Sequence, residues 1–168
     1  MLSEDDCVTG ALNHYSMLYI VDNQVAEAAM SAVTAWVEAG GKVVVTAGGA
    51  QLNEYNMTNA ATEALLPVVQ QGIWTGSRYS RHNATIFLVK QELPFAETLD
   101  EVSASSDPPL PPADAMGVFG EKSVFTYSGP SDGVRATFKD KSPAQVTTMK
   151  GKGSATYLGY HPGLAYYQ

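Results

Sequence analysis

The pattern of hydrophobic and polar positions divides this chain into two unlike halves. Residues 17–21 form a short, continuously apolar run, which is typical of a strand buried on both faces. Apolar residues then recur at the three-to-four-residue spacing of one buried helix stripe, namely Val25, Ala29, Ala32, Val33 and Trp36. Residues 42–47 are β-branched at nearly every position and predict a second buried strand.

Strand, helix and strand within about 30 residues predict a βαβ unit, whose two strands are parallel and joined by a right-handed crossover. We expect Asp22 or Asn23 to cap the helix, because a short side-chain oxygen accepts from the free N–H groups of a first turn. We expect Gly40-Gly41 to end it, because the chain takes a positive φ there.

The second half follows a different pattern. A polar loop over residues 48–59 leads to a short helix from about Ala60, which Pro67 disturbs. Beyond residue 84 the helical periodicity is lost, and the strand candidates are residues 84–89, 123–127, 134–138, 145–149 and 155–160. The Pro-rich residues 103–112 predict an irregular, extended connection. The chain is therefore expected to be an α/β protein, parallel at its start and β-rich, mostly antiparallel, afterwards.

Composition narrows the class of protein. A length of 168 residues fits one domain over residues 1–168, and its net charge of −7 without any basic run argues against nucleic acid or an anionic membrane surface as partner. No apolar run is long enough to cross a membrane and the first residues do not form a signal peptide, so we expect a cytoplasmic location. A doubly wound sheet usually has a strand and a helix before one such as 17–21, so we expect either a fragment of a longer protein or a trimmed version of the fold.

Several polar residues follow the predicted parallel strands at their carboxyl ends, where ligands bind in open α/β sheets. If those strands are neighbours, these residues predict a pocket for a small polar ligand. The candidates are Asp22, Gly48, Gly49, Glu54, Tyr55, Asn56 and His161. The alternative is local: Asx side chains satisfy turn amides, and a Glu in a Gly-rich loop often accepts backbone N–H bonds. The sequence leaves both interpretations open.

Other chemistry has weaker support. Gly48-Gly49 has bare amides of the kind that bind anions but lacks the spacing of a phosphate-binding loop. No His/Glu pair stands at metal spacing, so we expect neither a metal nor another cofactor. Cys7, the single cysteine, follows the acidic residues 4–6, which disfavour its thiolate; we expect it to be a bystander.

Three stretches, taken in their order, resemble one family. They are residues 18–47 with Trp36-Val37-Glu38-Ala39-Gly40-Gly41 at their centre, the loop Asn53-Glu54-Tyr55-Asn56, and residues 151–167 beginning Gly151-Lys152-Gly153. Together they resemble the class I glutamine-amidotransferase-like domain, of the type found as the trimerisation domain of certain bacterial β-galactosidases. The resemblance implies a flavodoxin-like, three-layer fold and a role in assembly.

The same resemblance implies that amidotransferase activity is absent. That family places a cysteine nucleophile on a tight turn after a strand, whereas residues 42–47 run into Gly48-Gly49-Ala50. His161-Pro162 keeps the His-Pro of the family's His-Pro-Glu, but Gly163 stands where the orienting glutamate belongs. Two of the three parts of a Cys–His site are therefore missing.

Two function hypotheses follow. The first is a non-catalytic domain of a carbohydrate-related bacterial protein, serving assembly as a homo-oligomer or with other domains of a longer chain, or binding a small polar ligand. The second, from a different class, is a small hydrolase in which His161 works with Glu54 or Asp22 as acid and base.

Overall fold

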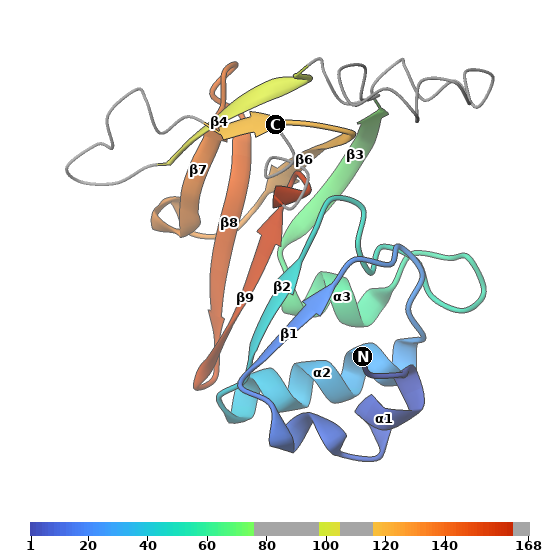
Figure 1. Cartoon of the computed structure of the whole chain (residues 1–168). Coiled ribbons are helices and arrows are strands. Elements are labelled where there is room, and N and C mark those ends of the chain that lie inside the picture. Colours follow the sequence, from blue (N-terminus) through green and yellow to red (C-terminus); the bar gives the residue numbers. More distant parts are fainter. Residues whose placement is uncertain (76–97, 105–115, 163–168) are drawn as a thin grey trace.

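The computed structural model describes residues 1–75, 98–104 and 116–162 (Figure 1). Its elements in chain order are α1 (Glu4–Val8), the 3-10 turn η1 (Ala11–His14), β1 (Met17–Ile20), α2 (Glu27–Ala39), β2 (Lys42–Val45), α3 (Ala60–Leu65), β3 (Val68–Thr75), β4 (Asp100–Ala104), β5 (Met116–Val118), β6 (Glu121–Tyr127), the 3-10 turn η4 (Ser131–Gly133), β7 (Val134–Phe138), β8 (Pro143–Lys150) and β9 (Gly153–Leu158).

Most strands belong to one curled, mixed sheet of seven, in the order β1-β2-β9-β8-β7-β4-β5. The strands β1, β2 and β9 are parallel neighbours, and the pairs from β9 to β5 are antiparallel. β3 and β6 form a separate antiparallel pair. The predicted combination of a parallel start and a β-rich, mostly antiparallel remainder is confirmed for the described residues.

The predicted βαβ unit is confirmed. β1 and β2 are adjacent and parallel, in register from Met17 opposite Lys42 to Ile20 opposite Val45. α2 joins them, and its buried side chains are Ala29, Met30, Val33, Trp36 and Val37. The helix ends at Gly40, whose φ of +128° is the left-handed conformation expected of a helix-ending glycine.

The predicted helix start is wrong. α2 begins at Glu27, after an N-cap residue, Ala26, that makes no side-chain cap. Asp22 instead caps its own turn, because its Oδ1 accepts the Gln24 N–H at 3.2 Å. The chain from Gln24 to Ala26 is extended and pairs with the 48–59 loop that follows β2. There the Val25 N–H donates to the Leu52 carbonyl at 2.9 Å.

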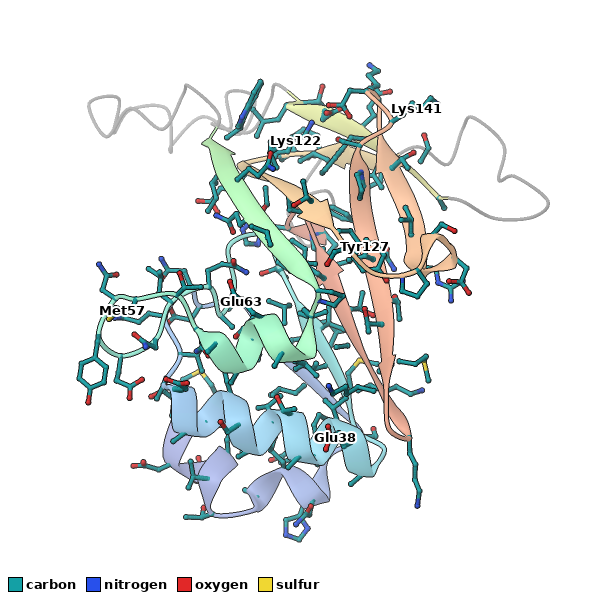
Figure 2. All side chains as sticks on the ribbon, turned by 180° about the vertical axis from the view of Figure 1, so that it is seen from behind. Glu38, Met57, Glu63, Lys122, Tyr127 and Lys141 are labelled. Carbon is teal, nitrogen blue, oxygen red and sulfur yellow. The ribbon has the colours of Figure 1, made fainter. Side chains whose placement is uncertain are left out.

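α2 and α3 lie on one face of the sheet, and α1 packs against α2. Seen from behind, α2, α3 and β3 stand in front of it (Figure 2). The main core fills this side, where the fully buried Val43, Val45, Ala155 and Tyr157 meet α2 and β6. A second core cluster gathers around β4, β5 and β7, with Phe138 and Leu158 among its members.

The opposite face of β1, β2, β9 and β8 carries no helix in the described ranges. We call it the open face. Strand register places its eight residues in two rows, Tyr19–Val44–Thr156–Thr147 and Met17–Lys42–Ser154–Met149. A three-layer fold has helices on both faces, so the expected flavodoxin-like, three-layer arrangement is not what the described residues form. They form a mixed α/β fold with a curled, β-rich sheet.

The strand predictions of the second half are mostly confirmed, as β6, β7, β8 and β9. Residues 84–89 lie outside the described residues. β3, β4 and β5 were not predicted, and residues 103 and 104 of the expected Pro-rich connection belong to β4. No helix of the described residues is long and apolar enough to cross a membrane.

The Gly151-Lys152 turn between β8 and β9 is fixed to the end of α2. The Lys152 N–H donates to the Glu38 carbonyl at 3.0 Å, and the Ser154 N–H donates to the Gly41 carbonyl at 3.2 Å. Gly151 takes a φ of +58°, which suits a two-residue hairpin turn. The hairpin therefore sets the position of β9 beside β2.

Candidate functional site

The carboxyl ends of the parallel strands meet at one edge of the sheet, as the sequence predicts. Since β1, β2 and β9 are neighbours, Asp22 follows β1 and Gly48 follows β2 at the same edge. A pocket of about 440 Å³ opens there. Its lining residues are Val21, Asp22, Asn23, Ala47, Gly48, Ile73 and Glu121. We call it the polar pocket.

His161 reaches this edge through a residue that the sequence analysis missed. Its Nε2 lies 3.1 Å from Oε2 of Glu121, which lines the polar pocket. The pair forms because Tyr160, just before His161, bridges to Lys122, just after Glu121, in antiparallel fashion. Glu121 and His161 are 40 residues apart in the chain, and no local sequence pattern predicts that they pair. The imidazole is half-buried, and the carboxylate is partly exposed.

Gly48 and Gly49 do not offer free amides to an anion. The Gly48 N–H donates to the phenol oxygen of Tyr157 at 3.2 Å, and the Gly49 N–H donates to the Thr46 carbonyl at 2.8 Å. Both donors are thus engaged, one by Tyr157 of β9 and the other within the turn that follows β2. A phosphate-binding role for this turn therefore has no support in the hydrogen bonding.

The Tyr157 phenol below Gly48 is the centre of a buried hydrogen-bond network. Besides accepting from Gly48, it shares a hydrogen bond of 2.8 Å with the Ser123 hydroxyl and donates to Oε1 of Gln70 at 3.4 Å. Burial raises its pKa, and Phe125 packs edge-on against the ring at a centroid distance of 4.9 Å. This network joins β9 and the β2 turn to the β3–β6 pair, which is a structural role.

Glu54 lies in the 48–59 loop after β2, which contacts the N-terminus of α2. Its Oε2 accepts the Glu27 N–H at 2.9 Å, and that hydrogen bond lowers the pKa of Glu54. Oε1 of Glu4 accepts the neighbouring Ala26 N–H at 2.8 Å. The two carboxylates replace the missing side-chain cap, because anions stabilise the positive end of a helix.

Tyr55 and Asn56 share that loop and do not line the polar pocket. Oδ1 of Asn53 accepts the N–H groups of Tyr55 and Met57, both at 3.0 Å. Asn56 takes a φ of +61°, and the Tyr55 ring is exposed. Glu54 thus makes the kind of bond that the local alternative expects, and in the same loop Asn53 caps the Tyr55 and Met57 amides.

The structure therefore divides the predicted site. It brings Asp22 and Gly48 together and adds His161 through Glu121, whereas Gly49, Glu54, Tyr55 and Asn56 lie outside the polar pocket's lining. The residues of the proposed acid–base pairs make other hydrogen bonds in the structure. The hydrogen bond described for His161 goes to Glu121, and the Glu54 carboxylate is engaged at α2.

Comparisons with known proteins give a fold and no family. No protein-family model matches the chain, and no curated protein matches it in sequence. Among solved structures, it is similar to a β-galactosidase from Rahnella sp. R3 (TM-score 0.69, 16% identity, covering 95% of this chain and 22% of that one). It is also similar to one from Bacillus circulans sp. alkalophilus (TM-score 0.68, 15% identity, covering 96% and 22%).

A third similar structure is a cytoplasmic protein from Salmonella typhimurium, with a TM-score of 0.58 at 16% identity, covering 96% of this chain and 66% of that one. The chain spans about a fifth of the length of the β-galactosidase chains. At these identities the likeness is one of fold. The same fold therefore occurs as a small part of much longer β-galactosidase chains.

Proposed function

We propose that this chain is a non-catalytic, amidotransferase-like assembly domain of a carbohydrate-related bacterial protein, and that copies of it associate through the open face. The observation that carries the proposal is the exposure of large apolar side chains there. Tyr19 is 62% exposed, Met149 70% and Met17 42%. Tyr and Met are enriched at protein interfaces, and a sheet face with such side chains is otherwise covered in a folded domain.

Charge favours a second copy as the occupant of this face. The chain carries a net charge of −7, yet Lys42 is the one charged residue among the eight of the open face. Two copies that meet through it bring no carboxylates of that face together. Association through most other parts of an acidic surface would oppose like charges.

Two further observations support an assembly role. The sequence resembles an amidotransferase-like trimerisation domain, and the cysteine and glutamate of active amidotransferases are missing here. In addition, the similar structures include β-galactosidases in which this fold is a minor part of the chain. Fold likeness alone does not transfer function, so the proposal depends on the open face itself.

The test is the molar mass of the protein in solution, measured by light scattering across a concentration series. We expect an oligomer that Met149→Lys and Tyr19→Lys each dissociate. Met57→Lys is the matched control, because Met57 is 65% exposed but lies in the 48–59 loop. A wild-type protein that stays monomeric up to its solubility limit, or a Met57→Lys variant that dissociates equally, would overturn the proposal.

The polar pocket supports a second candidate function, the binding of a small polar ligand by Asp22, Glu121 and His161. Carboxylate and imidazole groups around a recess hydrogen-bond hydroxyl-rich molecules. Mono- and disaccharides should then raise the melting temperature of the wild type but not of Asp22→Ala. A matched control is Glu54→Gln, which should keep the response. If no saccharide shifts either protein, a saccharide ligand for this pocket is excluded.

A further inference from the structure

The outer edge of β1 is a second surface, distinct from the open face. β1 ends the seven-stranded sheet, and no described strand pairs with its outer side. The Ile20 carbonyl accepts the Thr46 N–H at 3.1 Å, so the peptide groups of Ile20 point toward β2. Because these directions alternate along a strand, the N–H and carbonyl of Tyr19 point outward. They form part of a hydrogen-bonding edge that another strand is able to use.

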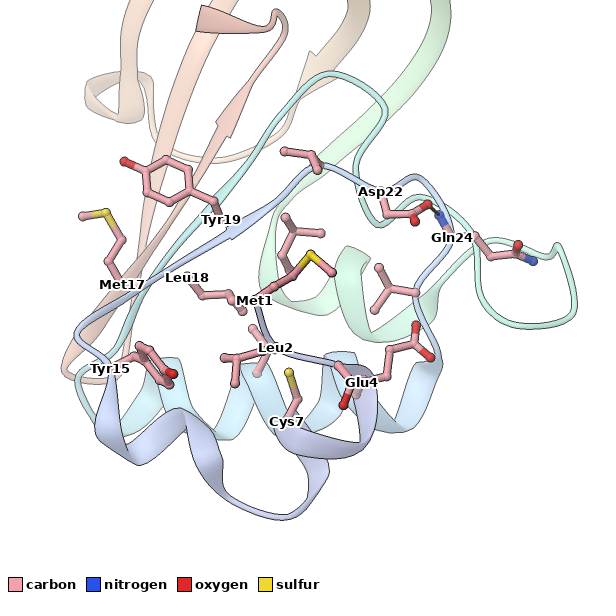
Figure 3. A pocket seen from close by; sticks show the side chains of 16 residues that line it. Met1, Leu2, Glu4, Cys7, Tyr15, Met17, Leu18, Tyr19, Asp22 and Gln24 are labelled. Atoms are coloured by element: carbon pink, nitrogen blue, oxygen red, sulfur yellow. Dashed lines mark hydrogen bonds between the residues drawn. The ribbon is translucent and has the colours of Figure 1, made fainter. Parts of the chain in front are cut away.

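A groove of about 590 Å³ runs along this edge (Figure 3). Six consecutive residues, 17–22, line it. Since neighbouring strand residues point to opposite faces, this lining follows the edge of β1 rather than one face of the sheet. Across from β1, the side chains of Leu2, Cys7 and Val33 give the groove an apolar wall.

The groove is acidic at one end. Glu4 and Asp22 both line it, close to the carboxyl end of β1, and Figure 3 shows them on the same side. Neither Lys nor Arg is among the lining residues, and the cationic group there is the N-terminal ammonium of Met1. A ligand that fits is therefore apolar along its length and positively charged where it passes Glu4 and Asp22.

We propose that the β1 edge binds an extended polypeptide segment as an eighth strand of the sheet. Its backbone pairs with the outward peptide groups of β1, its alternate apolar side chains enter the groove, and a Lys or Arg lies beside Glu4 and Asp22. The β1 edge of a second copy fits less well, because its own Glu4 and Asp22 would add carboxylates to an edge that already carries them.

Two synthetic peptides test this directly. The capped peptides are Lys-Val-Thr-Val-Thr-Val and Val-Thr-Val-Thr-Val-Lys, which carry the positive charge at opposite ends. The acidic end of the groove lies at the carboxyl end of β1. A peptide bound antiparallel to β1 therefore needs its lysine first, and one bound parallel needs it last. We expect one of them to bind in fluorescence polarisation, and the same peptide with Asp in place of Lys to bind at least several-fold more weakly. Failure of both lysine peptides to bind, or equal binding of the Asp peptide, would overturn the proposal.

A matched pair of protein variants isolates the edge. Tyr19→Pro removes an outward N–H without touching a β1–β2 hydrogen bond, and Tyr19→Val keeps it. Both lack the phenol of the open face, so a difference between them reports only on the edge. We expect the Pro variant to bind the peptide about tenfold more weakly than the Val variant. Equal affinities would overturn the proposal.

If Tyr19→Pro does not fold, amide exchange in the wild type takes its place. The peptide should slow exchange at the Tyr19 N–H measurably and leave the already paired Thr46 N–H unchanged. Unchanged exchange at Tyr19 under saturating peptide contradicts edge pairing. Each readout compares samples at one protein concentration and reports on the β1 edge rather than on the open face, so failure here leaves the assembly proposal standing.

Discussion

The carboxylate of Glu54 accepts a hydrogen bond from the backbone N–H of Glu27 at 2.9 Å, across 27 residues of chain. This contact ties the loop after β2 to the first turn of α2. Glu54, which the sequence analysis listed as a candidate ligand-binding residue, therefore has a structural role. A helix without a side-chain cap of its own thereby gains a negative charge at its positive end.

Replacing that charge should lower stability in a pH-dependent way. We expect Glu54→Gln to melt at a lower temperature than the wild type at neutral pH. The folded-state pKa of Glu54 is lowered from 4.5, so the contribution is complete above that value and is lost as pH falls through the folded-state pKa.

The measurement for Glu54→Gln is a series of thermal melts from pH 7 to pH 3. The control is Glu38→Gln, because Glu38 lies at the opposite end of α2, where a negative charge is unfavourable. The control should melt no lower than the wild type. A difference for Glu54→Gln that stays constant down to the lowest pH would contradict a charge-based cap.

Lys122 is a buried cation, and its loss should be costly. Its Nζ lies 2.6 Å from Asp100 Oδ2, with side-chain exposures of 8% and 10%, and 4.2 Å from the Phe138 ring centroid. Burial favours a raised pKa for Asp100, but the hydrogen bonds from Lys122 and two backbone N–H groups outweigh it and hold the pKa below its ordinary value.

Lys122→Met leaves the Asp100 carboxylate buried without this cation. We expect a loss of about 3–5 kcal/mol in the free energy of unfolding. Urea denaturation measures it. Lys139→Met is the control, because Lys139 pairs with Glu101 at the surface and should contribute less than about 1 kcal/mol. Equal losses in the two variants would refute the assigned role of Lys122.

At Gly153 the backbone of β9 lies directly against the end of α2. A Cβ built at this position would overlap the backbone carbonyls of Gly41 and Val37, which side-chain movement cannot relieve. We expect Gly153→Ala to lose about 1–3 kcal/mol, the range found for overpacked sites. In Gly72→Ala the new methyl meets nothing within 4 Å, so this control should stay within about 1 kcal/mol of the wild type. Chemical denaturation of both variants measures the two losses in the free energy of unfolding. Equal losses would contradict the close contact at Gly153.

Cys7 should react slowly. Burial raises the pKa of its thiol, and the negative charges of Asp6 and Glu4 raise it further, so little thiolate exists at neutral pH. Alkylation by iodoacetamide should be slower than that of free cysteine at pH 7 and should speed up as pH rises. Cys7→Ser should keep the melting temperature and molar mass of the wild type. Fast labelling at pH 7 would contradict this account.

The sequence predicts the elements whose pattern is local. β1, α2 and β2 follow from a buried run, an apolar stripe and a β-branched run. β3 was not predicted, because it follows Pro67 closely and contains Gly72. It forms a strand by pairing with β6, which lies some 50 residues later in the chain. β4, which begins with Asp100-Glu101, lacks an apolar run altogether. Long-range pairing decides such strands.

The site shows the same division. Asp22 and Gly48 were predictable, because strand order alone brings the carboxyl ends of β1 and β2 together. Glu121 was not, because it arrives with an antiparallel strand of another sheet. Glu54 does not line the polar pocket, because its carboxylate accepts the Glu27 N–H at the first turn of α2.

Methionine oxidation tests the central claim, that the open face is buried between copies. Met149 and Met57 have similar exposure in one chain, 70% and 65%, but only Met149 lies on the open face. Under dilute peroxide, with oxidation followed by peptide mass spectrometry, we predict that Met149 is protected several-fold relative to Met57 at high protein concentration. The protection should fade on dilution. Equal oxidation of both methionines at every concentration would contradict assembly through this face.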